Sequence, residues 1–333
     1  MDLLVALILL VVFLVVLTQS SRLTITNTIK VSAITGLGKT TVGFILVAFS
    51  TSVPELSVAI LSLLGNGEKT AVSVGNVIGS NIVNICLIIG LATLLVVFQK
   101  RSRNVKMIPP MAKEEFGSLY FGLFIASLIP LTLVYLTFAS RFIGLVLVLI
   151  FGVYTYQLSK IRIPQENNQV VSEEMKKKLR LHVVLTFLGV AGVVLSAYFI
   201  VESSVALAEF AGVSKSIIGA TIIAFGTSLP EFSIDINAFL KGHSALAFGD
   251  IVGSCFINIT LILGITLLAS PFSVQNITFF TDLVIFSLVA NLFLWYFLSM
   301  ERLGWKEGVI LLFIYILFLA TTIGAISLRP PTS

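Results

Sequence analysis

Two stretches of the sequence place a glutamate directly after a proline inside a long apolar run. The first carries Pro54 and Glu55, and the second carries Pro230 and Glu231. An ionisable side chain at membrane depth is costly to bury, so such a residue usually has a function. A structural pair of hydrogen-bonded glutamates is the alternative, but it does not explain why proline and hydroxyl residues accompany the glutamate both times. We therefore interpret both glutamates as functional.

Further oxygen-bearing residues recur around the glutamates. Thr51 precedes Glu55 by one helical turn, as Thr227 precedes Glu231, so each pair shares one helix face. Each proline also leaves a backbone carbonyl without its usual donor. The other hydroxyl and amide residues are Ser52, Ser228, Ser80, Asn84, Ser254 and Asn258. Carboxylate, carbonyl, hydroxyl and amide oxygens, without soft ligands, suit Ca²⁺ better than a transition metal.

Two further segments, residues 75–85 and 249–259, carry Ser80 and Asn84 and their equivalents, and we call them the Gly-Ser segments. Close helix packing is an alternative role for these segments. It accounts for Gly79 and Gly253 but poorly for Asn84 and Asn258. We therefore favour ion binding for the two asparagines.

The charge of the two glutamates sets what can bind between them. When both are ionised they carry a charge of −2, which one Ca²⁺ cancels, and which Na⁺ ions or two protons cancel in its absence. Competition between these cations for the same carboxylates is the physical basis of exchange. A ligand must interact differently with the two access states if it is to drive transport.

The composition identifies the protein as a polytopic membrane protein. Hydrophobic residues make up 57% and charged residues 11% of the 333 residues, and the mean hydropathy is +1.07. The partner indicated is therefore the lipid bilayer. The net charge of +5 does not indicate nucleic acid, because the basic residues lie in loops that flank apolar runs. No protein partner is predicted, and Cys86 and Cys255 are interpreted as small core residues.

Apolar runs of membrane length predict an all-α protein with ten transmembrane helices. The first run lacks a basic start and a cleavage site, so we interpret it as a retained helix rather than a signal peptide. The predicted spans begin with a long helix from residue 3 past residue 22, followed by 36–64, 71–98, 116–138, 141–158, 182–211, 214–240, 244–270, 278–299 and 305–327. This arrangement places most Lys and Arg on one side, which the positive-inside rule assigns to the cytoplasm. Both termini are then extracytoplasmic.

The two glutamate stretches belong to an internal repeat. Residues 43–85 align with residues 219–259, and we predict five-helix repeats over 1–158 and 182–333 joined by a cytoplasmic linker at 159–181. Because five is an odd number of helices, the halves enter the membrane in opposite senses. Such inverted-topology repeats are typical of secondary transporters, which bind their substrate at the repeat interface.

At these motifs the sequence resembles the prokaryotic sodium/calcium exchanger family of the Ca²⁺/cation antiporter superfamily. The resemblance covers nearly the whole chain and implies Ca²⁺ extrusion driven by Na⁺ entry across a prokaryotic cell membrane, with the first and sixth helices sliding as gates. It also implies that Glu55 and Glu231 are the Ca²⁺ ligands. By the same resemblance, the residues lining and completing the Na⁺ and Ca²⁺ sites are Thr51, Ser52, Thr227, Ser228, Ser80, Asn84, Ser254 and Asn258.

Three positions depart from the pattern of that family. Ser50 replaces a glycine, and Asn258 stands where some archaeal relatives have aspartate. Asp235 lies one turn after Glu231, and its repeat equivalent is Ala59. We expect Asp235 to face a cytoplasmic vestibule, with an added proton-sensitive carboxylate as the alternative.

Asn76 and Asp250 occupy equivalent positions, two helical turns before Asn84 and Asn258 respectively. We interpret them as capping or vestibule residues.

The leading hypothesis is therefore a secondary-active antiporter that exchanges Ca²⁺ for Na⁺ by alternating access. An H⁺-driven or less selective cation/Ca²⁺ antiporter is the alternative, and a Ca²⁺-permeable channel is the competing class. The spans contain no Ser/His pair, zinc-ligand set or phosphate loop, so we predict no enzymatic activity. No cofactor is predicted, because Ca²⁺ and Na⁺, with H⁺ as an alternative, are cargo.

Overall fold

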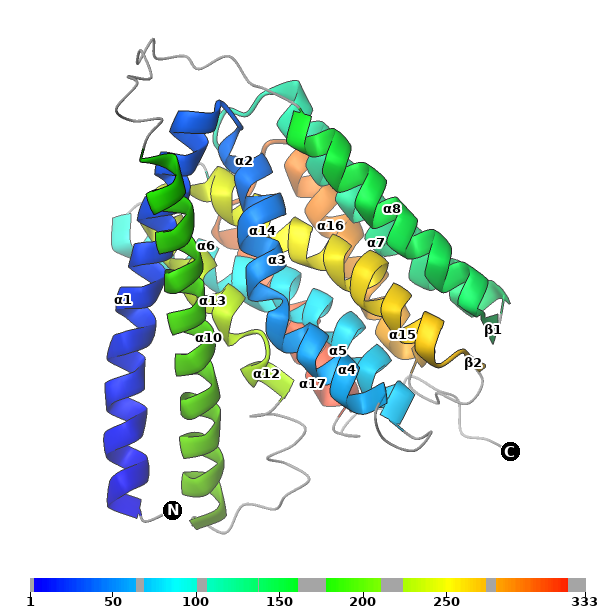
Figure 1. Ribbon diagram of the computed structural model, residues 1–333, viewed down its shortest axis with the longest axis horizontal. Coiled ribbons are helices and arrows are strands. Elements are labelled where there is room, and N and C mark those ends of the chain that lie inside the picture. The colour runs from blue at the N-terminus through cyan, green and yellow to red at the C-terminus, as the bar shows by residue number, and fades with distance from the viewer. Residues whose placement is uncertain are drawn as a thin grey trace.

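The computed structural model is a bundle of long apolar helices (Figure 1). It describes residues 3–63, 69–100, 107–136, 138–160, 178–210, 224–273 and 280–322. In this part of the chain eight helices are long and apolar enough to cross a membrane, and one bent helix pair raises the number to nine. The predicted all-α membrane fold is confirmed. The predicted count of ten is not tested, because much of the span at 214–240 lies outside the described residues.

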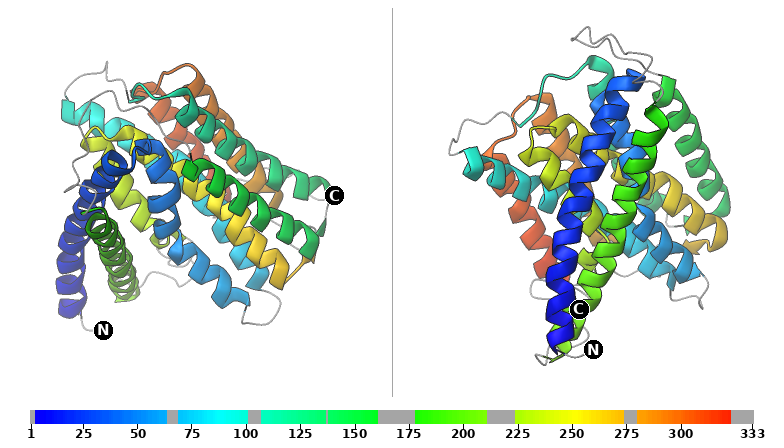
Figure 2. Two further views of the ribbon diagram at one scale, coloured as in Figure 1. Left: turned by 45° about the horizontal axis from the view of Figure 1, so that its top comes forward. Right: turned by 60° about the vertical axis from the view of Figure 1, so that its left-hand side comes forward.

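Two long helices form a pair at one edge of the bundle. They are α1 (Leu3–Thr35) and α10 (Leu179–Phe210), which lie side by side and extend beyond the other helices (Figures 1 and 2). Gly189 and Gly192 permit this close packing, because a Cβ atom at Gly189 would lie 2.8 Å from the backbone nitrogen of Thr24. The predicted first and sixth spans are therefore each other's main partners.

The first glutamate stretch forms a helix that is interrupted twice. It runs through α2 (Lys39–Val42), the π-helical turn η1 (Gly43–Val47), α3 (Ala48–Thr51) and α4 (Val53–Leu63). The equivalent stretch of the second half is described from α12 (Ala224–Gly226) and α13 (Leu229–Leu240) onwards. Both stretches thus break at the residues just before their prolines, as expected for a ring that cannot donate to the preceding turn.

The two Gly-Ser segments lie on the most buried spans of the protein. One span comprises α5 (Lys69–Ile82), η2 (Val83–Ile89) and α6 (Gly90–Lys100). The other comprises α14 (Ser244–Ile257), η4 (Asn258–Ile262) and α15 (Leu263–Ala269). In the second of these spans, 83% of the residues in its most apolar stretch are buried within the protein, whereas in α1 the share is 11%. Polar side chains on transmembrane spans almost always face the bundle interior, and transporters of this architecture bind their substrates near the midplane.

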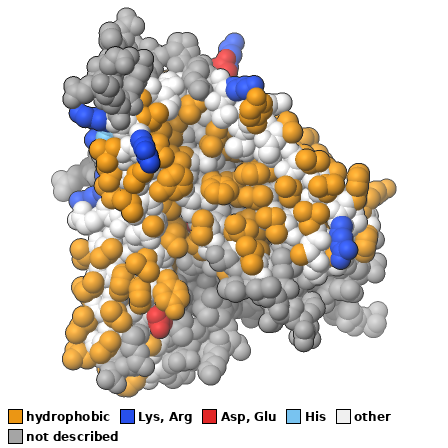
Figure 3. Space-filling model, in the orientation of Figure 1, with side chains coloured by type: hydrophobic (Ala, Val, Ile, Leu, Met, Phe, Trp, Pro, Cys, Tyr) orange, Lys and Arg blue, Asp and Glu red, His pale blue; other side chains and the backbone are white. Residues whose placement is uncertain are grey.

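The remaining helices enclose these spans on the side away from α1 and α10. They are α7 (Lys113–Leu136), α8 (Arg141–Lys160), α16 (Phe280–Ser299) and α17 (Trp305–Thr322). A short antiparallel pairing joins β1 (Phe138–Ala139) to β2 (Phe272–Ser273) in the loops beside α8 and α15. Hydrophobic side chains cover much of the visible face, as a surface in contact with lipid requires (Figure 3).

Candidate functional site

Backbone breaks position both glutamates. Ser52 has ψ 7° and Ser228 has ψ 8°, so the chain leaves helical geometry at equivalent residues. In the first half, the helix axis turns by 43° between Lys39–Thr51 and Val53–Ile60. Each glutamate then lies in the first turn of the helix that restarts after the break. This arrangement places each carboxylate beside a break and in the interior of the bundle.

The two asparagines of the predicted site lie in π-helical turns. Asn84 belongs to η2, and Asn258 begins η4. Single π-helical turns within α-helices are uncommon and occur often at functional sites. Their occurrence at equivalent residues of both halves means that the repeat extends to local backbone geometry.

The two glutamates approach each other from different halves of the chain. Glu55 and Glu231 are each 1% exposed and close enough to interact electrostatically. Glu55 accepts a hydrogen bond from the hydroxyl of Ser80 at 3.4 Å and also lies against Thr227. Glu231 lies against Thr51. Each glutamate thus contacts the threonine of the opposite half, so the two motifs meet in the interior of the bundle.

The same hydrogen bond occurs in both halves around this site. The Thr51 hydroxyl donates to Asp250 Oδ1 at 3.3 Å, and the Thr227 hydroxyl donates to Asn76 Oδ1 at 3.2 Å. These donors are repeat equivalents, as are the two acceptors. Thr51 also lies 3.5 Å from the hydroxyl of Ser254. Each threonine therefore links its broken helix to the Gly-Ser helix of the other half.

A second contact across the halves involves a residue that sequence reasoning missed. Asn258 Nδ2 donates to Asn81 Oδ1 at 3.0 Å, and Asn81 Nδ2 donates to the carbonyl of Cys255 at 3.4 Å. Asn81 and Cys255 are themselves repeat equivalents. Because the equivalent of Asn81 is a cysteine, comparison of the two halves does not mark Asn81 as a site residue.

Several buried oxygens of the site have no hydrogen-bond donor. Such groups are rare in folded proteins and call for an explanation, which a bound cation provides. Among the predicted ligands these atoms are Ser52 Oγ, Ser228 Oγ, Glu55 Oε2, Glu231 Oε2, Asn84 Oδ1 and Asn258 Oδ1. Within the described residues, no three His, Cys, Asp or Glu side chains gather around one point. The donor set is thus two carboxylates with neutral oxygens, which fits a hard cation.

The structure places every predicted ligand in the interior. Nine of them are buried, and Thr227 is half-buried at the break before α13. Two interpretations of neighbouring carboxylates are wrong for this conformation. Asp235 and Asp250 are completely buried rather than exposed to a vestibule, and Asp250 lies inside α14 rather than at its N-terminus. The interpretation of Asp250 relied on its uncharged repeat equivalent, Asn76, and that of Asp235 relied on its position near a helix end.

The packing role proposed for one glycine is confirmed. A Cβ atom at Gly253 would lie 2.7 Å from Phe44 Cα and 2.8 Å from Ala48 Cβ, so α14 crosses η1 and α3 at contact distance. No described atom lies within 4 Å of the equivalent point at Gly79. The residues equivalent to 44–48 in the second half are 220–224, and most of them lie outside the described residues.

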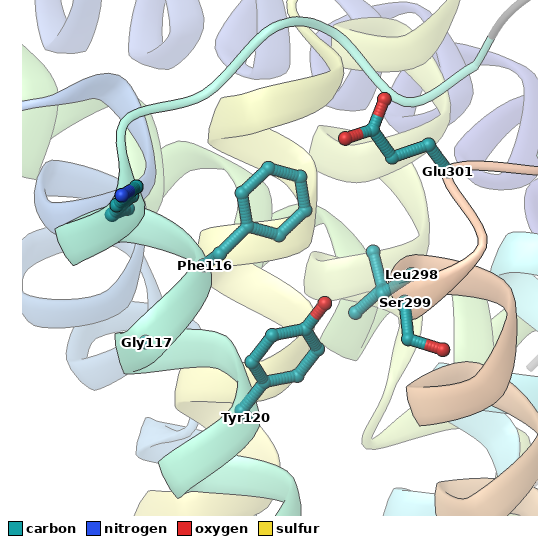
Figure 4. Close-up of a pocket in the computed structure, with 7 residues that line it drawn as sticks. Phe116, Gly117, Tyr120, Leu298, Ser299 and Glu301 are labelled. Carbon is teal, nitrogen blue, oxygen red and sulfur yellow. The ribbon is translucent and has the colours of Figure 1, made fainter.

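A pocket of about 310 Å³ lies elsewhere, between the start of α7 and the end of α16 (Figure 4). Phe116, Tyr120 and Leu298 form its apolar wall, and Glu301 stands at its edge. None of its lining residues belongs to the predicted ion site.

Comparison with known proteins agrees with this architecture. The family described as sodium/calcium exchanger protein matches residues 5–160 and 181–324. The sodium/calcium exchanger MaX1 of Methanosarcina acetivorans is 28% identical, over 85% of this chain and 89% of its own length. The putative antiporter CaxA of Alkalimonas amylolytica is 33% identical, over 69% of this chain and 70% of its own.

Solved structures extend the likeness to the fold. The sodium-calcium exchanger NCX_Mj, in a crystal soaked with zero Na⁺ and Ca²⁺, superposes with a TM-score of 0.80 at 22% identity. The superposition covers 96% of this chain and 99% of that one. A second structure of the same protein, soaked with 10 mM Na⁺, gives a TM-score of 0.79. With the family match spanning most of the sequence, the chain belongs to the sodium/calcium exchanger family of membrane transporters.

Proposed function

We propose that this protein exchanges Ca²⁺ for Na⁺ at a single site that Glu55 and Glu231 share. The observation that carries the proposal is the crossed arrangement of the site, in which each buried glutamate lies against the threonine of the other half. Two facing carboxylates repel each other unless cations or protons neutralise them. One Ca²⁺ neutralises both, and Na⁺ ions can do so in its place, so binding of one ion excludes the other.

The proposed ligands divide into charged and neutral groups. Glu55 and Glu231 supply the negative charge, and the hydroxyls of Thr51 and Thr227 lie beside them. The remaining proposed ligands are Ser52, Ser228, Ser80, Asn84, Ser254 and Asn258, whose oxygens raise the coordination number towards the 6–8 that Ca²⁺ takes. No part of this chemistry requires a cofactor.

We propose that α1 and α10 move together as the gate of an alternating-access cycle. They pack on each other through Gly189 and Gly192. The hydroxyl of Ser21 links α1 to α13, because it donates to the carbonyl of Ser233 at 2.9 Å and accepts from Asn237 Nδ2 at 3.2 Å. Helices joined by few polar contacts can slide as a shear motion, which changes the side from which the site is open.

The inverted repeat and its orientation are part of the proposal. Support comes from three basic residues that lie close together although they are distant in sequence: Arg22 within α1, Lys39 at the start of α2 and Lys241 directly after α13. Burial and the charges of Lys39 and Lys241 lower the pKa of His243, and burial and Arg22 lower the pKa of Lys241. Ten spans place these residues on one side, which the positive-inside rule identifies as cytoplasmic.

Cysteine labelling in intact cells tests this orientation. The native Cys86 and Cys255 are 0% exposed, so their background labelling is expected to be low. A membrane-impermeant maleimide should label Arg141→Cys directly and Lys241→Cys only after permeabilisation, because both positions are exposed and lie on opposite sides in the proposed topology. Labelling of both variants from the same side would refute the ten-span arrangement.

Transport in proteoliposomes tests the counter-ion. We expect an outward-directed Na⁺ gradient to drive ⁴⁵Ca²⁺ uptake, and a pH gradient without Na⁺ to drive none, because Na⁺ rather than H⁺ releases the site for Ca²⁺. Uptake driven by protons alone would replace the proposal with an H⁺-driven antiporter. Flux that needs no counter-ion would indicate a channel. Liposomes without protein, with a Na⁺ ionophore added, control for leak and membrane potential.

A further inference from the structure

A second pair of acidic residues lies beside the proposed exchange site. Asp235 follows Glu231 by one turn on α13, and Asp250 precedes Ser254 by one turn on α14. Both are 0% exposed, and their carboxyl groups are neighbours. One turn corresponds to about 5–6 Å along a helix. This pair is therefore displaced from the glutamates towards the turn between α13 and α14.

Three of the four carboxylate oxygens of this pair lack hydrogen-bond donors. Both carboxylate oxygens of Asp235 and Oδ2 of Asp250 are buried without a hydrogen-bond partner. The remaining oxygen, Asp250 Oδ1, accepts from the hydroxyl of Thr51 at 3.3 Å. The charged groups that act on Asp235 are the carboxylates of Asp250 and Glu231, which repel it. The Asp235 and Asp250 carboxyl groups also lie within hydrogen-bonding reach of each other. Buried carboxylates whose charged neighbours are all negative must be neutralised by a cation or by a proton.

The repeat does not account for this pair. The equivalents of Asp235 and Asp250 in the first half are Ala59 and Asn76. Asn76 accepts the Thr227 hydrogen bond without a charge, so the structural link between the halves does not need an aspartate. The second half therefore carries two extra carboxylates that packing does not explain.

We propose that Asp235 and Asp250, together with the hydroxyl of Thr51 from the first half, form a Na⁺ position whose carboxylates only the second half of the chain supplies. The proposal rests on the exchange function proposed above and assigns one of its Na⁺ ions. Na⁺ fits better than a second Ca²⁺ for two reasons. The pair offers fewer side-chain oxygens than the 6–8 that Ca²⁺ takes. Repulsion from a Ca²⁺ between the glutamates is half as large for a monovalent ion.

Equilibrium binding to the purified full-length protein in nanodiscs tests this position. The Na⁺ bound is counted with ²²Na⁺, and Ca²⁺ affinity is measured with ⁴⁵Ca²⁺ in the absence of Na⁺. The variants are Asp250→Asn and Asp235→Ala, which introduce the residue types that the first half carries at the equivalent positions. Asp282→Asn in the first turn of α16 serves as the matched control.

We expect each site variant to bind one fewer Na⁺ than the wild type and the control, and to retain its single Ca²⁺. An unchanged Na⁺ count in folded variants would overturn the proposal, including the case in which the pair shares a proton and only the pH dependence changes. A loss of one of two bound Ca²⁺ would also overturn it.

The experiment distinguishes a refutation of this Na⁺ position from a refutation of the exchange function. If the wild type binds Na⁺ and Na⁺ displaces Ca²⁺, but the aspartate variants bind as many Na⁺ as the wild type, only the aspartate position is refuted. If Na⁺ does not displace Ca²⁺ from the wild type, the exchange function itself is refuted. Thermal unfolding of each variant in the same nanodiscs confirms that the compared proteins are folded.

Discussion

Glu55→Gln and Glu231→Gln should each abolish Na⁺-driven Ca²⁺ uptake while the protein still inserts and folds. Glutamine keeps the shape of the side chain but removes one of the two charges that balance Ca²⁺. Breaking a buried ion pair costs about 3–5 kcal/mol, which corresponds to a loss of Ca²⁺ affinity of roughly 100-fold or more. Uptake of ⁴⁵Ca²⁺ into proteoliposomes, with binding measured on the same preparation, checks the expected result.

The control for this experiment is Glu202→Gln. Glu202 is exposed on α10 and lies outside the proposed ligand set, so its substitution changes net charge by the same amount without touching the site. We expect its uptake to match the wild type. Transport at the wild-type rate by either site variant would refute the assignment of the shared site, whereas a loss in all three variants would point to a general effect of surface charge or expression.

The glutamate site could be predicted from sequence because repetition marks it twice. Glu55 and Glu231 each follow a proline and a threonine in an apolar run, and chance does not place such a pattern in both halves. The positions of the spans could be predicted for a different reason, because a membrane-crossing helix needs about 20 apolar residues and such runs stand out in the sequence. The crossed contacts, with Thr227 beside Glu55 and Thr51 beside Glu231, depend on tertiary packing that spacing along one helix does not reveal.

Residues that break the repeat were the ones that sequence reasoning misjudged. Asp250 was interpreted through its uncharged equivalent, Asn76, and Asp235 through its position near a helix end. Asn81 went unnoticed because Cys255 occupies its place in the second half. Comparing the halves detects what both copies share, whereas an asymmetric function requires one copy to differ. The unpaired oxygens of Asp235 became visible only when the neighbouring side chains were placed around them.

The helix crossing near the site depends on the absence of side chains at two glycines. A Cβ atom at Gly249 would overlap the carbonyl oxygen of Thr40 and lie 2.8 Å from its carbonyl carbon. At Gly43 it would lie 3.0 Å from the backbone nitrogen of Asp250. These neighbours are backbone atoms, which cannot rotate away as a side chain can. The crossing of α2 and η1 over α14 therefore fixes where Thr51 meets Asp250.

Gly249→Ala should consequently destabilise the protein and weaken Ca²⁺ binding together. The added methyl group forces α14 away from Thr40, and overpacking of this kind typically costs about 1–3 kcal/mol. Gly152→Ala on α8 is the matched control, because no described atom lies within 4 Å of the added carbon there. We expect thermal unfolding in nanodiscs to show a lower midpoint for Gly249→Ala alone, and ⁴⁵Ca²⁺ binding to show reduced affinity in the same variant. If Gly249→Ala matched Gly152→Ala in both measurements, the crossing could relax without moving the site, and the close contact at Gly249 would not be what aligns the two halves.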